Sequence, residues 1–324
     1  MAAIPTTEAG VWYAPDREED RFLLEGPREV VVDGDAAVAW VNIQTAADAT
    51  TGDIHVLFTD DEDDRFYLTA PARPGFLFPR ARPNTLLVGV GKDLRTCDLS
   101  AGTWSDPIAT VPDANPRTII NDGEIVPGGR AVVFGTKDTR FENTIAELYL
   151  YTVDDGKLTV LTGGQTCSNG KVFARDDRGF VLYDIDTPRK VVTRYRLDVD
   201  KRALTEEGVA VDLRSRPDFP DGMCGCGDGT AIIAFYNPAP APAGRAVRYR
   251  LDTGDVVEEW TTPGSPRVTC PLLVTRDGSV KLILTTATEG MPADMREQCP
   301  EAGSLFIADT TLTKAPAAEV VQIA

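Results

Sequence analysis

Histidine is nearly absent from this chain of 324 residues, in which His55 is the single example. A Ser-His-Asp triad, a Cys-His dyad or a zinc site built on several histidines would therefore have to depend on His55. His55 lies in the alternating run "GDIHVLFTD", which predicts a partly exposed position on a β-strand. If the protein is an enzyme, we expect carboxylates, amides and a hard metal ion to carry its chemistry.

Basic residues and long apolar runs are scarce as well. The 33 Lys and Arg residues stand against 50 Asp and Glu, a formal net charge of −17. Nucleic acids and anionic membranes both require a basic surface, so neither is an expected partner. No apolar run approaches the roughly 18 residues of a membrane span, and the N-terminal region lacks the pattern of a secretory signal. We expect a soluble cytoplasmic protein with free cysteines and a small-molecule partner.

Helical patterns are rare too, and short runs rich in Val, Ile, Leu, Phe and Tyr recur between Asp-Gly, Gly-Gly and Pro-rich turns. The runs fall into six groups of about four strands, or 54 residues per group in a chain of 324. This length is typical of a propeller blade. We therefore predict an all-β, six-bladed β-propeller with a central channel, and a pair of β-sandwiches is the alternative.

We expect residues 1–324 to form a single domain. The predicted blades are residues 28–70, 75–111, 122–162, 170–212, 222–262 and 268–324. The last group lacks one strand, which either "GVWYA" near the N-terminus or "AEVVQIA" at the C-terminus would supply.

Four predicted blades are preceded by a short polar residue followed by Gly or by Asp-Gly. These residues are Glu25, Asn121, Asn169 and Asp221. Asn121 and Asn169 are 48 residues apart, and Asn169 and Asp221 are 52 apart, close to one blade each. The innermost strands of a propeller all run the same way along the channel, so residues ahead of them gather at one mouth. One Asn-Gly or Asp-Gly is an ordinary turn, but four in blade register predict a site.

The four side chains offer carboxylate and carboxamide oxygens, without sulfur or imidazole. Such ligands suit a divalent ion with open positions for water or substrate. Calcium is the ion we expect first, and Mg²⁺, Mn²⁺, Fe²⁺ and Zn²⁺ also fit.

Short motifs occur in a set order along the chain: "EGP" at 25–27, "NDG" at 121–123, "FGT" at 134–136, "SNG" at 168–170 and "PDGM" at 220–223. In this ordered set, from about residue 20 to 310, the chain resembles the family of gluconolactonase, senescence marker protein (regucalcin) and luciferin-regenerating enzyme. The resemblance implies a six-bladed propeller with one divalent cation in its channel. It also implies a metal-dependent lactonase, a carboxylic ester hydrolase that opens a sugar lactone or related cyclic ester with ion-activated water.

Residue by residue, the resemblance implies that Glu25, Asn169 and Asp221 bind the metal. Asp221 is then also the general base that takes a proton from water. Asn121 lies beside the ion in this interpretation, where it holds substrate or water.

The resemblance also locates a departure from the family. Members often carry a basic, substrate-binding residue two positions before the asparagine of "NDG", and here that position is Ile119. Arg117 and Lys137 are the candidate replacements for substrate binding. Glu289 fits either the channel mouth or an exposed loop.

Two other functions fit the same four residues. Diisopropyl fluorophosphatase resembles this architecture and hydrolyses phosphoesters with a similar set of ligands around calcium, so a phosphotriesterase is one alternative. A non-catalytic calcium-binding propeller is the other.

The pair Cys224 and Cys226 follows Asp221 closely. Residues two apart on a strand face the same side, so both thiols point one way and Met223 the other. We expect small buried side chains that pack between blades, and a thiolate metal site or redox pair is the alternative.

Overall fold

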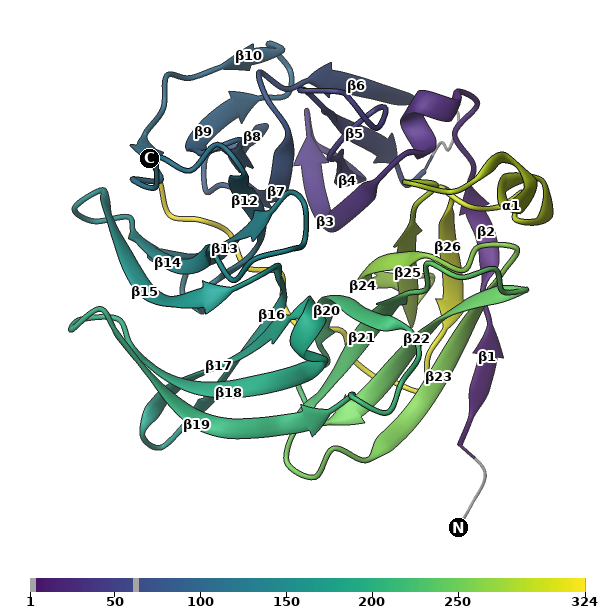
Figure 1. The fold of residues 1–324 in the computed structure, drawn as a ribbon. Helices are drawn as coiled ribbons and strands as arrows, with labels where there is room; N and C mark the ends of the chain where they lie inside the picture. Colours follow the sequence, from purple (N-terminus) through teal and green to yellow (C-terminus); the bar gives the residue numbers. More distant parts are fainter. Residues whose placement is uncertain (1–3, 61–63, 324) are drawn as a thin grey trace.

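The computed structural model describes residues 4–60 and 64–323 and shows six β-sheets arranged around a central channel (Figure 1). Each sheet contains an antiparallel meander that starts with its innermost strand. This architecture confirms the all-β six-bladed propeller. Within the described residues, no helix is long and apolar enough to cross a membrane.

The first three blades contain the strands β3 to β15. Their bounds are β3 (Leu24–Val32), β4 (Asp35–Asn42), β5 (Asp53–Phe58) and β6 (Arg65–Thr69); β7 (Pro74–Pro79), β8 (Thr85–Val90), β9 (Asp93–Asp98), β10 (Thr103–Trp104) and β11 (Ala109–Thr110); β12 (Thr118–Ile125), β13 (Ala131–Asp138), β14 (Ala146–Thr152) and β15 (Lys157–Gln165). Both β10 and β11 pair with β9, so the outer edge of the second blade is made of two short pieces.

The last three blades contain the remaining strands. Their bounds are β16 (Ser168–Asp176), β17 (Gly179–Asp186), β18 (Val191–Asp198) and β19 (Ala203–Asp212); β20 (Phe219–Gly225), β21 (Thr230–Tyr236), β22 (Ala243–Arg250), β23 (Val256–Pro263) and β1 (Thr6–Glu8); β24 (Val268–Arg276), β25 (Ser279–Thr286), β26 (Leu305–Asp309) and β2 (Gly10–Tyr13). The helical segments described are η1 (Glu18–Arg21), η2 (Thr187–Arg189) and α1 (Ala293–Gln298).

The N-terminal segment closes the ring. Strand β2 pairs antiparallel with β26 and completes the last blade, while β1 adds to the edge of the fifth blade in parallel with β23. The N-terminal "GVWYA" is therefore the closing strand. The C-terminal segment lies elsewhere: the Val321 amide donates to the Pro79 carbonyl at 2.9 Å, and the Val321 side chain is buried beside the second blade.

All six innermost strands share one irregularity near their first residues. The register with the second strand slips by one residue, which makes a β-bulge. The slips fall between Glu25 and Arg28, Pro74 and Phe76, Ile120 and Gly123, Ser168 and Lys171, Pro220 and Met223, and Val268 and Pro271. The bulges occupy equivalent positions in all six blades; Asn121, Asn169 and Asp221 lie inside their bulges, and Glu25 is the last paired residue before its own.

The sequence predicts the four polar residues in turns ahead of the inner strands, and this prediction is wrong in detail. They lie within the strands at the bulges, and the blades accordingly begin up to four residues earlier than expected. The neighbouring glycines serve close packing as much as turning. A Cβ on Gly170 would lie 2.5 Å from the Cβ of Met223, and one on Gly222 would lie 2.6 Å from Cys270 Sγ. Glycine is therefore what lets adjacent inner strands approach each other around the axis.

Candidate metal centre

The bulges bring Glu25, Asn121, Asn169 and Asp221 together at the floor of a single cavity of about 660 Å³. We call it the mouth cavity. Each of the four side chains is between 5% and 9% exposed. Residues separated by almost 200 positions thus converge because their strands occupy equivalent places in successive blades.

The second strands of the blades form the wall of the mouth cavity. They run antiparallel to the inner strands, so their last residues lie at the edge where the inner strands begin. Lys137 at the end of β13, Thr187 after β17, Tyr236 at the end of β21 and Glu289 after β25 all line the cavity. Glu289 therefore occupies the mouth position.

Glu25 and Asp221 are two buried carboxylates without a cationic partner at ion-pair distance within the described part of the chain. Burial raises the pKa of Glu25 well above its usual value, and the charges of Asp221 and Asp122 raise it further. Burial likewise raises the pKa of Asp221, with the Lys137 ammonium opposing the shift and Asp122 adding to it. Two such carboxylates buried in one cavity favour a bound cation, because a cation stabilises both in the ionised form.

A chain of hydrogen bonds fixes the orientation of the Asn169 amide. Asn121 Nδ2 donates to Asn169 Oδ1 at 2.9 Å, and Asn169 Nδ2 donates to Thr187 Oγ1 at 2.8 Å. Thr187 Oγ1 in turn donates to the Pro220 carbonyl at 2.9 Å, so it must accept from Asn169. The Asn169 oxygen, with a lone pair to spare, is thereby held on the side opposite Thr187.

The two predicted substrate-binding cations have different places. Lys137 lines the mouth cavity and is 7% exposed. The structure does not bring Arg117 there: its Nε donates to Asp138 at 3.0 Å, and its Nη2 pairs with Asp138 and with Glu142. Ile119 is paired across the strands with Lys137. Of these two predicted cations, Lys137 is therefore the one that lines the mouth cavity.

Sequence reasoning missed three contributors to the site. Asp122, the middle residue of "NDG", acts on both buried carboxylates, and its own pKa is raised by burial. Thr187 and Arg267 line the cavity from positions with no motif. Thr187 follows a second strand, and Arg267 immediately precedes an inner one, so blade register was the available signal.

The cysteines are packing residues. All six are free, and burial raises the pKa of the Cys226 thiol to about 11 and that of Cys224 well above its usual value. Both pack in one apolar cluster, while Met223 packs in the cluster on the other side of the strand. The predicted alternation is confirmed, and the unreactive protonated thiols argue against a thiolate site.

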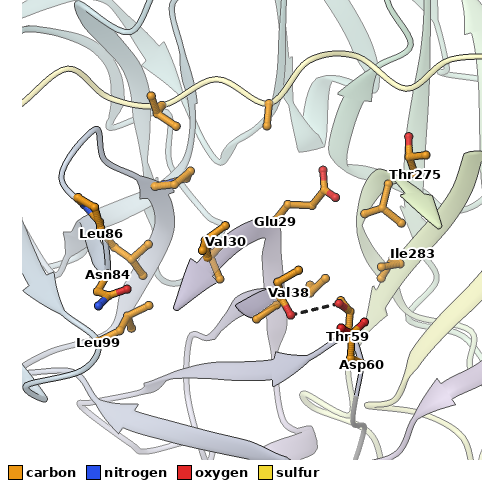
Figure 2. A pocket seen from close by; sticks show the side chains of 18 of the residues that line it. Glu29, Val30, Val38, Thr59, Asp60, Asn84, Leu86, Leu99, Thr275 and Ile283 are labelled. Carbon is orange, nitrogen blue, oxygen red and sulfur yellow. Dashed lines mark hydrogen bonds between the residues drawn. The ribbon is translucent and has the colours of Figure 1, made fainter. Parts of the chain in front are cut away.

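A larger cavity of about 1000 Å³ lies at the opposite ends of the inner strands (Figure 2). Its wall combines aliphatic residues, such as Val30, Val38 and Leu86, with charged ones, such as Glu29 and Asp60. None of the four predicted site residues lines it. The converging oxygen ligands are at the other end of the channel.

A second group of potential ligands lies outside the channel. Single ligand atoms of Asp20, Asp53 and His55 are within 4.8 Å of one another and could hold a metal ion. Arg17 already donates to both Asp20 oxygens, at 2.8 and 2.7 Å. His55 is buried and stacked on two aromatic rings at 5.5 and 5.8 Å, so the expectation of a partly exposed histidine is wrong. Burial also lowers the pKa of His55.

Comparison with known proteins identifies the family and supports the fold. Residues 24–288 match the family described as SMP-30/Gluconolactonase/LRE-like region. The chain belongs to this family. The family that the sequence motifs resemble is thereby confirmed, and it includes a protein from Bacillus subtilis provisionally named sugar lactone lactonase YvrE.

Members of the SMP-30/gluconolactonase family differ considerably in sequence from this chain. Regucalcin of Xenopus laevis is 26% identical over 215 residues, 64% of this chain and 69% of that protein. The Bacillus subtilis protein is 29% identical over 196 residues, 60% of this chain and 63% of its own length. The crystal structure of a calcium-binding regucalcin from Agrobacterium tumefaciens superposes with a TM-score of 0.79 at 21% identity, covering 99% of this chain and 100% of that one. At this identity the superposition supports the fold.

Proposed function

We propose that the protein is a divalent-metal-dependent hydrolase that opens a sugar lactone or a related cyclic ester. The observation that supports it is the convergence of Glu25, Asn169 and Asp221 on one cavity. The family includes lactonases by name, and the relatives named regucalcin are calcium-associated.

The residues at the cavity floor fit a hard divalent ion such as calcium. Glu25 and Asp221 provide two carboxylates, and Asn169 provides an amide oxygen whose orientation is fixed by its neighbours. Oxygen-only ligands at a cavity open to solvent are the set that calcium, magnesium or manganese prefers. When bound, such an ion supplies Lewis-acid polarisation of the substrate carbonyl.

The protein's own side chains account for binding and proton transfer. Asp221 is placed to accept a proton from a water molecule that enters the cavity, since its carboxylate makes no hydrogen bond to another described residue. Asn121 has both amide hydrogens engaged at the floor, so its Oδ1 is left to accept from a water or a substrate hydroxyl. Lys137 faces the substrate from the wall.

The experiment is a panel of aldonolactones and phosphotriesters assayed on protein purified without chelators, with metal analysis alongside. We expect lactone turnover that a chelator abolishes and added calcium restores. Turnover of phosphotriesters alone would support the phosphotriesterase alternative, and tight metal binding without turnover of either class would support a calcium-binding propeller. Metal-independent lactone hydrolysis, or full activity in Asp221→Asn, would contradict the mechanism.

A further inference from the structure

Lys137 is a buried cation in the wall of the mouth cavity. Among the described residues, its ammonium forms no hydrogen bond or ion pair, and it lies over the Phe141 ring, 5.9 Å from Nζ to the ring centre. The second cation of the cavity, Arg267, is already engaged, because its guanidinium donates to the carbonyls of Glu289 and Pro238. Lys137 is therefore the cation available to a ligand.

The charges around the cavity show why that ammonium needs an anion. Three carboxylates and two cations line the mouth cavity, a net charge of −1; they are Glu25, Asp221, Glu289, Lys137 and Arg267. In the metal-free protein, the Lys137 ammonium is offset by the carboxylates, whose pKa values it lowers. A divalent ion at the floor changes the net charge to +1 and leaves an excess positive charge on the wall.

The remaining wall gives a substrate few polar contacts. Leu23, Ile43, Phe141, Phe219 and Pro238 are all apolar lining residues. Apolar surroundings strengthen an ion pair, because they exclude water and lower the effective dielectric constant. A negative charge on the substrate would therefore pair with Lys137 more strongly than at an exposed site.

We propose that the mouth cavity selects a lactone that carries a carboxylate in addition to its reacting ester group, and that Lys137 is the residue that binds this carboxylate. The inference rests on the lactonase function proposed above. Lys137 is then a specificity-determining residue, and the preferred substrates are anionic rather than neutral lactones.

The test compares D-glucono-1,4-lactone with D-glucaro-1,4-lactone. The two differ only at C6, which is a hydroxymethyl group in the first and a carboxylate in the second. We expect calcium-loaded protein to prefer the carboxylated lactone by about tenfold or more in kcat/KM, and Lys137→Met to reduce that preference by about tenfold. Lys137→Arg should retain most of it. Lys201→Met is the matched control, because it removes the same charge from an exposed β18–β19 turn. Thermal unfolding of each variant verifies that it is folded.

Calcium affinity gives a second measurement that does not depend on turnover. Lys137→Met removes a positive charge close to both carboxylates, so calcium should bind about threefold to tenfold more tightly by calorimetry. Unchanged calcium affinity would show that the Lys137 charge does not act at the floor of the cavity, and an equal loss of kcat/KM on both lactones would show that Lys137 does not act on a substrate substituent. Either result would overturn the inference.

The two proposals can fail separately. If neither lactone is hydrolysed, the lactonase proposal fails, and calorimetric binding of the two lactones to the calcium-loaded protein decides the inference. The inference is supported if the carboxylated lactone binds more tightly than the neutral one and Lys137→Met abolishes this difference. Equal binding of the two lactones to the wild-type protein would overturn it.

Discussion

Replacing Asp221 with Asn tests the cavity geometry through stability as well as activity. In the metal-free protein, Glu25 and Asp221 are buried together and repel each other, so removing one charge should stabilise the fold. A buried charge without a partner lowers the free energy of unfolding by at least about 1 kcal/mol. Unfolding entropy of roughly 2.1 cal/mol/K per residue gives about 0.7 kcal/mol/K for the 324 residues. The Tm of metal-free Asp221→Asn should thus rise by about 1.5 °C or more.

Calcium should reverse the order of the two proteins. At a concentration of about 100 Kd, a ligand of the folded state adds roughly 2.7 kcal/mol, which corresponds to about 4 °C in Tm with the same entropy. The variant should lose this increase because it lacks one of two carboxylate ligands. Differential scanning calorimetry with chelator and with calcium measures both effects, and Asp200→Asn, in the exposed β18–β19 turn, is the control.

The pH dependence follows from the sign of the pKa shifts. Glu25 and Asp221 have raised pKa values in the folded state, so the folded protein binds more protons than the unfolded chain. Stability of the metal-free protein should fall as the pH rises above about 4, by up to about 1.4 kcal/mol per pH unit for each carboxyl, until the folded-state pKa is passed. The advantage of Asp221→Asn should therefore vanish near pH 4. A variant that is less stable than wild type at neutral pH, or that keeps the full calcium effect, would refute the reasoning.

Three further changes probe the surroundings of the site. Asn121→Ala removes the hydrogen bond that orients Asn169 and should weaken calcium binding by about tenfold to 100-fold in calorimetry; unaltered affinity would show that the amide needs no support. Gly222→Ala places a Cβ against Cys270 and should destabilise the protein by about 1–3 kcal/mol in denaturant unfolding, unless the two inner strands can separate without cost. Cys226→Ala should lower stability while calcium affinity is retained, and the buried wild-type thiol, whose pKa is raised, should react only slowly with thiol reagents at neutral pH; fast reaction there would contradict its buried position.

The repeating pattern of the sequence was sufficient to predict the propeller and the floor of the cavity. Strand groups of about 54 residues fix the number of blades, because each meander of four strands consumes a similar length of chain. Asn121, Asn169 and Asp221 recur at that spacing, so placing them at one mouth required only the parallel course of the inner strands. Their exact location in bulges was not predictable, since a bulge depends on the register with the second strand.

The tertiary structure alone decided which other side chains line the mouth cavity beside Asn121, Asn169 and Asp221. Arg117 and Lys137 looked equivalent in sequence, but Arg117 is paired with Asp138 while Lys137 faces the cavity. Thr187 carries no motif, yet it fixes the Asn169 amide from η2, 18 residues further along the chain. Periodicity is a property of the backbone repeat, and the sequence therefore determined the blades and the level of the site. Hydrogen-bond and charge partners come from neighbouring strands and blades, so only the folded chain determined which cation and which hydroxyl complete it.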